Sequence, residues 1–257
     1  MNEKISKNLE YWKERLFAAY GEEHILNITL YGSQNYGIDI ENSDVDVKAI
    51  YIPSLEEAIL NQNYLSKELK NEKNEHCEIK DIREMFKMYK KQNLNFLETL
   101  YTDYRWDNPI YKPINDELKR NKEKIAHYNP SAAMKSICGQ ALSAIYNFEK
   151  NPSNKKTLAK ILHLYLFICK YEEKKDYKSC FYVSKKEKLF GHSAKETLIA
   201  LKNQTDNIDI DISFLEKFFK EIFNESNNVK YKKRKTDIDN LLNKLICDAI
   251  CKTNKEK

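Results

Sequence analysis

A chain of 257 residues, of which 41% are hydrophobic, is long enough to bury a sizeable core as one large domain or two small ones. Its formal net charge of +5 is a mild excess that permits nucleic-acid binding without implying it. No apolar run approaches the roughly 20 residues of a membrane span, and the polar start lacks the features of a secretory signal. The six cysteines form no CxxC pair. We therefore predict a cytoplasmic protein without membrane contact.

The first part of the chain alternates between helical and strand-like patterns. Apolar residues at helical spacing predict an amphipathic opening helix over residues 8–20. An apolar strand follows and ends at Gly32. After a polar loop, a second strand is expected to carry Asp44, Asp46 and Lys48 on one side and small apolar residues on the other.

A short helix and a hairpin are predicted next. Ser54 and Glu57 have the spacing of a capping box, which predicts a helix start after Pro53. The polar residues 70–74 predict a turn between strands over residues 64–69 and 75–80. These strands and the two before them predict a small mixed sheet.

From residue 81 onward the apolar spacing becomes helical, so we predict an α+β fold with a mainly helical C-terminal region. The best boundary lies between Tyr101 and Pro113, which divides the chain into residues 1–107 and 108–257. The helix signals in this region are Ser131 before a helix over 132–148, Ser153 before the next helix, a capping box of Ser193 and Glu196, and helical patterns over 212–223 and 237–251.

The most informative chemical feature is the pair Asp44 and Asp46, two residues apart in a predicted strand. Successive side chains of a strand alternate sides, so both carboxylates project from the same face. Two such charges raise each other's pKa, whereas a divalent cation holds both in the ionised form. Upstream, the turn at Gly32 and Ser33 offers backbone N–H groups to an anion. The segment therefore predicts a metal side and a phosphate side together, which points to nucleotide chemistry.

These residues resemble a known superfamily. A glycine-serine turn followed, after a loop, by an alternating acid pair is similar to the signature of the DNA polymerase beta nucleotidyltransferases. The fuller segment over residues 31–37, together with Ser43 beside the first acid, resembles the predicted nucleotidyltransferases of bacteria and phages. Some relatives in that group are associated with RNA repair. The resemblance is sharpest over residues 25–59.

The resemblance implies a site in which two metal ions, Mg²⁺ or Mn²⁺, are bridged by three carboxylates. Asp44 and Asp46 match the first two catalytic, metal-binding positions. We predict Glu78 as the third, because it lies in the hairpin strand and projects opposite its apolar neighbours. Glu75 and Asp81 are the alternatives.

The chain also departs from its relatives, which usually carry aspartate near the position of His76. This departure leaves open a weakened or altered metal site. For the nucleotide, we predict that Gly32 lets the backbone approach a triphosphate, that Ser33 donates its hydroxyl to a phosphate oxygen, and that Lys48 either neutralises a phosphate or pairs with Asp46.

Several other polar residues have both a functional and a purely structural interpretation. The resemblance places Asn93, Asn95 and Glu98 in a cleft wall, although helix capping is the simpler role for the asparagines. His163 is either a cleft residue, with Lys155 and Lys156, or a hydrogen-bonded packing residue. The basic run over residues 230–235 is either a phosphate grip or a solvated linker.

We therefore expect a metal-dependent nucleotidyltransferase that moves a nucleoside monophosphate from a nucleoside triphosphate to a hydroxyl and releases pyrophosphate. RNA, particularly a tRNA-like or broken 3′ end, is the first acceptor by family association. The alternative is a catalytically inactive nucleotide- or RNA-binding module of the same fold that has lost the third carboxylate.

Overall fold

The computed structural model describes residues 3–61, 64–173, 176–205, 210–228 and 236–253. A mixed five-stranded sheet lies in its N-terminal half. The strand order is β3-β4-β2-β1-β5. The strands of this sheet are β1 (Ile25–Tyr31), β2 (Asp46–Tyr51), β3 (Ser66–Lys70), β4 (His76–Asp81) and β5 (Arg105–Asp107).

The register of the central strands brings the predicted site together. Strand β1 runs antiparallel to β2 and pairs Tyr31 with Asp46, so the turn after β1 lies beside the start of β2. Strand β4 runs parallel to β2 and pairs Lys48 with Glu78. Side chains of β2 and β4 that face the same way therefore lie next to each other.

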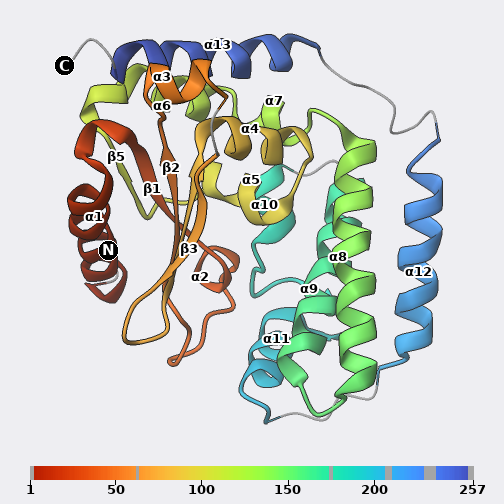
Figure 1. Ribbon diagram of the computed structural model, residues 1–257. Coiled ribbons are helices and arrows are strands. Elements are labelled where there is room, and N and C mark those ends of the chain that lie inside the picture. Colours follow the sequence, from red (N-terminus) through yellow and green to blue (C-terminus); the bar gives the residue numbers. More distant parts are fainter. Residues whose placement is uncertain (1–2, 62–63, 174–175, 206–209, 229–235, 254–257) are drawn as a thin grey trace.

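The helices cover both faces of the sheet and build the second half of the chain (Figure 1). Those in the first half are α1 (Glu3–Tyr20), α2 (Ser33–Tyr36), α3 (Leu55–Ile59), α4 (Ile82–Lys90), α5 (Leu94–Leu97) and the 3-10 turns η1 (Glu22–His24) and η2 (Glu98–Leu100). The remainder are η3 (Pro109–Tyr111), α6 (Lys112–Arg120), α7 (Lys122–Ala126), α8 (Pro130–Lys150), α9 (Lys155–Glu172), α10 (Tyr177–Phe181), α11 (Ala194–Lys202), α12 (Ile212–Glu225) and α13 (Thr236–Thr253), with a small ribbon of β6 (Lys188–Leu189) and β7 (His192–Ser193).

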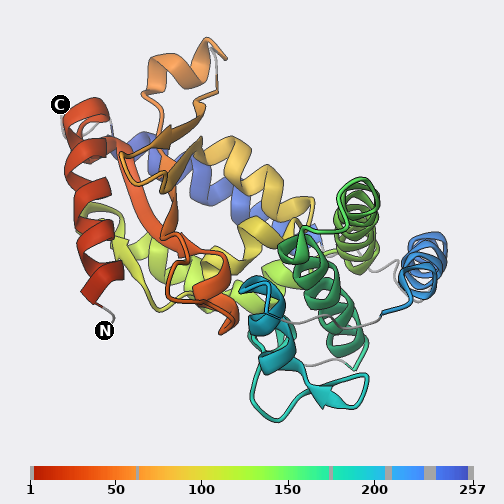
Figure 2. The same cartoon turned by 90° about the horizontal axis from the view of Figure 1, so that it is seen from below.

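Two hydrophobic clusters lie on opposite faces of the sheet. Helix α1 packs Trp12 and Leu16 against one face, where Val47 and Ile79 point. Ile50 and residues of α4, α5, α8, α9 and α13 share the other cluster. Figure 2 shows α1 and α4 on opposite sides of the strands. The second cluster contains residues from both sides of position 107, so the predicted boundary, which stays a prediction, does not divide the core.

The predicted fold class is confirmed: a mixed sheet with flanking helices leads into a helical region. The capping box of Ser54 and Glu57 is present at α3. The opening helix begins earlier than predicted, at Glu3. Strand β2 begins at Asp46, so Asp44 lies in the preceding loop rather than on the strand.

Two predicted helix starts and one predicted capping box need correction. Asn129 caps α8 and Pro130 is its first residue, so Ser131 is already helical. Asn154 rather than Ser153 caps α9. Ser193 precedes α11 but makes no capping hydrogen bond with its side chain. Asparagine is as good a cap as serine, and where both occur the sequence does not identify the cap.

The membrane prediction can be compared with the described helices. Within the ranges that the structure describes, we find no helix with the length and apolar character needed to cross a bilayer.

Candidate active site

Asp46 and Asp44 lie where the loop after α2 enters β2. Asp46 is half-buried, and the backbone N–H of His76 donates to its Oδ1 at 2.9 Å. Asp44 is exposed. Burial raises the pKa of Asp46, the hydrogen bond from His76 opposes this rise, and the negative charge of Asp44 adds to it. The two acids therefore act on each other electrostatically, and a bound cation would relieve that repulsion.

The turn at Gly32 lies directly beside this acid pair. Gln34 donates its Nε2 to the backbone oxygen of Asp44 at 2.8 Å, and the hydroxyl oxygens of Ser33 and Ser43 are 3.4 Å apart. Gly32 has φ 93°, and a Cβ built on it would meet nothing within 4 Å. The position thus favours glycine and leaves open space against the backbone.

A buried carboxylate supports this turn from below. Glu98 is fully buried and accepts hydrogen bonds from the Gly32 N–H at 2.9 Å, Asn35 Nδ2 at 3.2 Å and the Tyr36 hydroxyl at 2.6 Å. Burial raises the pKa of Glu98 to about 7, although these three donors act in the opposite direction. The turn was expected to offer its backbone N–H groups to a phosphate. The Gly32 N–H instead donates to Glu98, so it is not open to a phosphate.

Lys48 and Glu78 form an ion pair on the same face of the sheet as Asp46. Lys48 is almost completely buried; its amine contacts Glu78 and lies 3.9 Å from the centre of the Tyr31 ring. Lys80 also pairs with Glu78, at 3.0 Å. Burial alone would raise the pKa of Glu78, but the two lysines lower it below its ordinary value. Glu78 is thus a counterion of two lysines, and its role as third ligand stays a prediction, as does the nucleotide role of Lys48.

Glu75, the first alternative third acid, bonds to other residues, although its negative charge still raises the pKa of Asp46. It accepts hydrogen bonds from Asn8 of α1 and from Asn71, each at 2.8 Å. These contacts hold its carboxylate toward α1, which covers the face of the sheet opposite Asp46.

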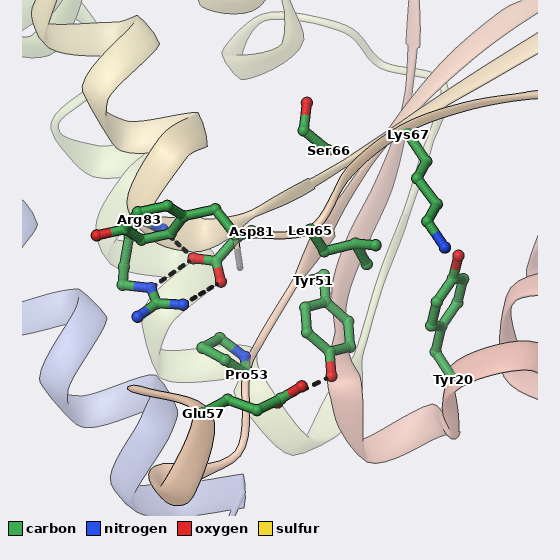
Figure 3. A pocket seen from close by; sticks show the side chains of 10 residues that line it. Tyr20, Tyr51, Pro53, Glu57, Leu65, Ser66, Lys67, Asp81 and Arg83 are labelled. Atoms are coloured by element: carbon green, nitrogen blue, oxygen red, sulfur yellow. Dashed lines mark hydrogen bonds and ion pairs between the residues drawn. The ribbon is translucent and has the colours of Figure 1, made fainter. Parts of the chain in front are cut away.

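Asp81, the second alternative, lies at the far end of β4. It is five residues beyond the neighbour of Asp46, which is about 16 Å along a strand. Arg83 binds its carboxylate through two hydrogen bonds of 2.9 and 2.7 Å. Figure 3 shows this pair in a cavity of about 450 Å³ that it shares with Tyr20 and Tyr51. Asp81 therefore belongs to a different part of the molecule.

His76 of β4 lies beside Asp46 of β2, because the next residues of the two parallel strands, Cys77 and Val47, are paired. Its Nδ1 is 2.6 Å from Oε1 of Glu68 on the edge strand β3. A carboxylate bonded to one ring nitrogen fixes the orientation of the imidazole. Beside Asp46 this chain thus presents an oriented histidine, whose partner Glu68 no local sequence pattern indicated.

A divalent cation can be tested against these donors. Mg²⁺ is commonly held by one or two carboxylates together with substrate phosphates and waters. Asp44 and Asp46 supply such oxygens, and within the described ranges no group of three acid, histidine or cysteine side chains gathers as a metal cage. The donor set therefore fits a cation shared with a triphosphate, rather than one enclosed by protein alone.

The helical half holds α2 in place. The His163 ring is buried, contacts the backbone oxygen of Phe181 at 2.6 Å, and its centre lies 4.5 Å from that of the Tyr36 ring. Burial lowers the pKa of His163 to about 4. The Val183 N–H donates to the backbone oxygen of Tyr36 at 2.8 Å. These contacts agree with the packing role that the sequence allowed for His163.

Lys202, at the end of α11, reaches the same loop and was missed by the sequence analysis. Its amine donates to the backbone oxygen of Ile38 at 2.9 Å. Burial lowers the pKa of Lys202, Asp39 and Asp44 oppose this, and Lys156 adds to it. Lys202 therefore lies within electrostatic range of Asp44, and Lys156 lies within electrostatic range of Lys202. No local pattern marks Lys202, because only the fold brings it there.

The comparisons with known proteins agree with this geometry. The family model of RlaP, described as an RNA repair pathway DNA polymerase beta family, matches residues 1–248. The chain belongs to the RlaP family. No curated protein matches the sequence. The family match supports nucleotidyl transfer as the general kind of activity, and it extends through the helical half, well beyond the segment where the sequence resemblance is sharpest.

Asn93, Lys156 and the basic run were also candidate site residues. Asn93 caps α5 and accepts from the backbone N–H of Asn95 at 3.1 Å, which confirms the capping role. Lys156 is exposed at the start of α9. The basic run over residues 230–235 lies outside the described residues.

Replacing Glu98 tests whether a buried carboxyl supports the turn. Its pKa is about 7 in the fold and near 4.5 when exposed, so between these values the folded protein binds the extra proton. The wild type should therefore lose stability relative to Glu98→Gln as the pH rises from about 4.5 to 7. Urea unfolding at several pH values measures this difference, with Glu221→Gln on α12 as the exposed control.

A constant difference between wild type and Glu98→Gln across this range would show that folding does not raise the pKa of Glu98. Glu98→Ala should be destabilised by about 1–3 kcal/mol at every pH, because it leaves buried donors without an acceptor.

Replacing Glu78 distinguishes a counterion from a metal ligand. Glu78→Gln should lower the free energy of unfolding by about 1–3 kcal/mol, since it leaves the buried Lys48 amine without its carboxylate. Adding Lys48→Met should recover much of that loss, because both charges are then gone. In a Mn²⁺ titration monitored by electron paramagnetic resonance, Glu78→Gln should bind Mn²⁺ with an affinity near that of the wild type. A loss of Mn²⁺ affinity as large as that of Asp46→Ala would instead make Glu78 a ligand.

Proposed function

We propose that this RlaP-family protein is a metal-dependent nucleotidyltransferase that moves a nucleoside monophosphate from a nucleoside triphosphate to a hydroxyl acceptor and releases pyrophosphate. One observation carries the proposal: Asp44 and Asp46 lie directly beside an open glycine turn, in a chain whose family is of the polymerase beta type.

The residues of the chain act mainly by positioning and by charge. Asp44 and Asp46 would hold the divalent cation, which when bound neutralises triphosphate charge and favours the ionised acceptor hydroxyl. The His76 N–H fixes the carboxylate of Asp46. Glu98 fixes the turn, so that the open space at Gly32 and the hydroxyl of Ser33 face the phosphates. Such preorganisation lowers the barrier because the groups need not be rearranged during transfer.

RNA is the acceptor we propose, since the matched family is described as an RNA repair pathway family. A tRNA-like or broken 3′ end supplies the hydroxyl that the reaction needs. Mg²⁺ and Mn²⁺ are both suitable cations for two carboxylates and a triphosphate.

A second candidate function is an inactive module that binds nucleotide or RNA. It is favoured by His76 at the position beside Asp46 and by the two lysines that neutralise Glu78. Glu78, Glu75 and Asp81 each have other partners, so none of these three is a free third carboxylate beside Asp46.

Label transfer separates these two functions. The purified chain is incubated with α-³²P-labelled nucleoside triphosphates, Mg²⁺ or Mn²⁺ and RNA with a free 3′ hydroxyl. We expect labelled RNA from the wild type and at least a 100-fold loss in Asp44→Ala/Asp46→Ala, because the cation loses both ligands. The matched control is Asp103→Ala/Asp116→Ala, which removes two exposed acids elsewhere. Binding without transfer in all variants would favour the inactive module.

A further inference from the structure

A polar cavity of about 550 Å³ lies between α8 and α9, next to the start of α5. Ten residues line it, and eight of them have polar or charged side chains, whereas the other two are Gly139 and Ala144. A cavity with so little apolar lining is unsuited to a hydrophobic ligand. Its polar lining includes Asn93, Lys135, Gln140, Asn147, Thr157 and Lys160.

The charge of this cavity has one sign. Lys135 and Lys160 line it from different helices, and no acidic residue is among its ten lining residues. Neither lysine forms an ion pair with a residue that the structure describes. The Nε2 atom of Gln140 is buried and has no hydrogen-bond partner within the described part of the chain. The cavity therefore combines unpaired positive charge with amide and hydroxyl groups, which suits a ligand that carries phosphates and hydroxyls.

Helix α9 connects the cavity with the candidate active site. Lys160 lies one helical turn after Lys156 on the same side of the helix. Lys156 acts electrostatically on Lys202, which in turn lies within range of Asp44 and bonds to the loop leading to it. The chain also connects the cavity with the glycine turn. Asn93, which lines the cavity, precedes α5, and η2 then begins at Glu98, which accepts from the Gly32 N–H. Cationic groups thus extend from the cavity to the acid pair.

We propose that this cavity and the adjoining side of α9 bind the phosphate backbone of a single-stranded polynucleotide and direct its 3′ end to Asp44 and Asp46. The inference rests on the proposed function and adds the surface that selects a polynucleotide as the acceptor.

A strand fits the distribution of charge better than a mononucleotide does. A triphosphate concentrates its charge within one small group. The proposed site for that group is at Gly32, Ser33 and the acid pair. Here the lysines are spread over two helices and follow a path, as repeating phosphates require. The amides of Gln140 and Asn147 and the hydroxyl of Thr157 can bond to sugars or base edges along that path.

Fluorescence anisotropy tests the proposal with a 5′-labelled oligouridylate of about 12 nucleotides. The variant Lys135→Gln/Lys160→Gln should bind the probe about tenfold more weakly at 0.1 M salt than the wild type. The slope of log affinity against log salt should fall by about 1.4, because each phosphate contact to a single strand contributes about 0.7. The control Lys112→Gln/Lys119→Gln changes the net charge equally on α6, across the molecule, and should bind like the wild type.

Three results would overturn the proposal. The first is an unchanged affinity and slope in Lys135→Gln/Lys160→Gln, and the second is a wild type that does not bind the probe. The third is an equal loss of affinity of this variant for ATP with Mg²⁺, which would assign the cavity to the triphosphate. Equilibrium binding needs no chemistry. If the wild type transfers no label but the variant still loses RNA affinity, the proposed function fails while the RNA surface stands.

Discussion

The buried carboxylate of Glu98 is the constraint on which the candidate site depends. Its oxygens hold the Gly32 N–H, Asn35 and Tyr36, and these residues form the turn and the short helix beside the acid pair. A fully buried acid costs free energy unless it is hydrogen-bonded, and three donors offset that cost here. The shape of the turn is thus set by a residue that is distant in sequence and has no contact with solvent.

The same turn also depends on the helical half of the chain. Val183 bonds to the backbone of Tyr36, the Tyr182 ring packs closely against Gly37, and Lys202 holds Ile38. One hydrophobic cluster extends from the sheet into these helices. The helical region therefore supports the candidate site and adds the Lys202 amine near Asp44, which agrees with a family match that covers nearly the whole chain.

Local patterns predicted much of the fold and part of the site. The acid pair, the glycine turn and the hairpin follow from strand alternation and turn residues near one another in sequence, and the structure has them close to the predicted positions. What the sequence missed depends on long-range contacts. The pairing of Glu78 with Lys48, of His76 with Glu68 and the approach of Lys202 arise from strand register and helix packing, which residue spacing does not specify. Asp44 was placed on the strand because alternation continues into the loop, although strand pairing begins at Asp46.

Amide hydrogen exchange with and without ATP and Mg²⁺ tests most directly whether the nucleotide binds between the glycine turn and the acid pair. We expect slower exchange in residues 31–37 and 43–46 of the wild type, since a bound triphosphate and cation would order both segments together. The protection should disappear in Asp44→Ala/Asp46→Ala. Protection confined to other segments, or equal protection in the variant, would contradict this assignment of the site.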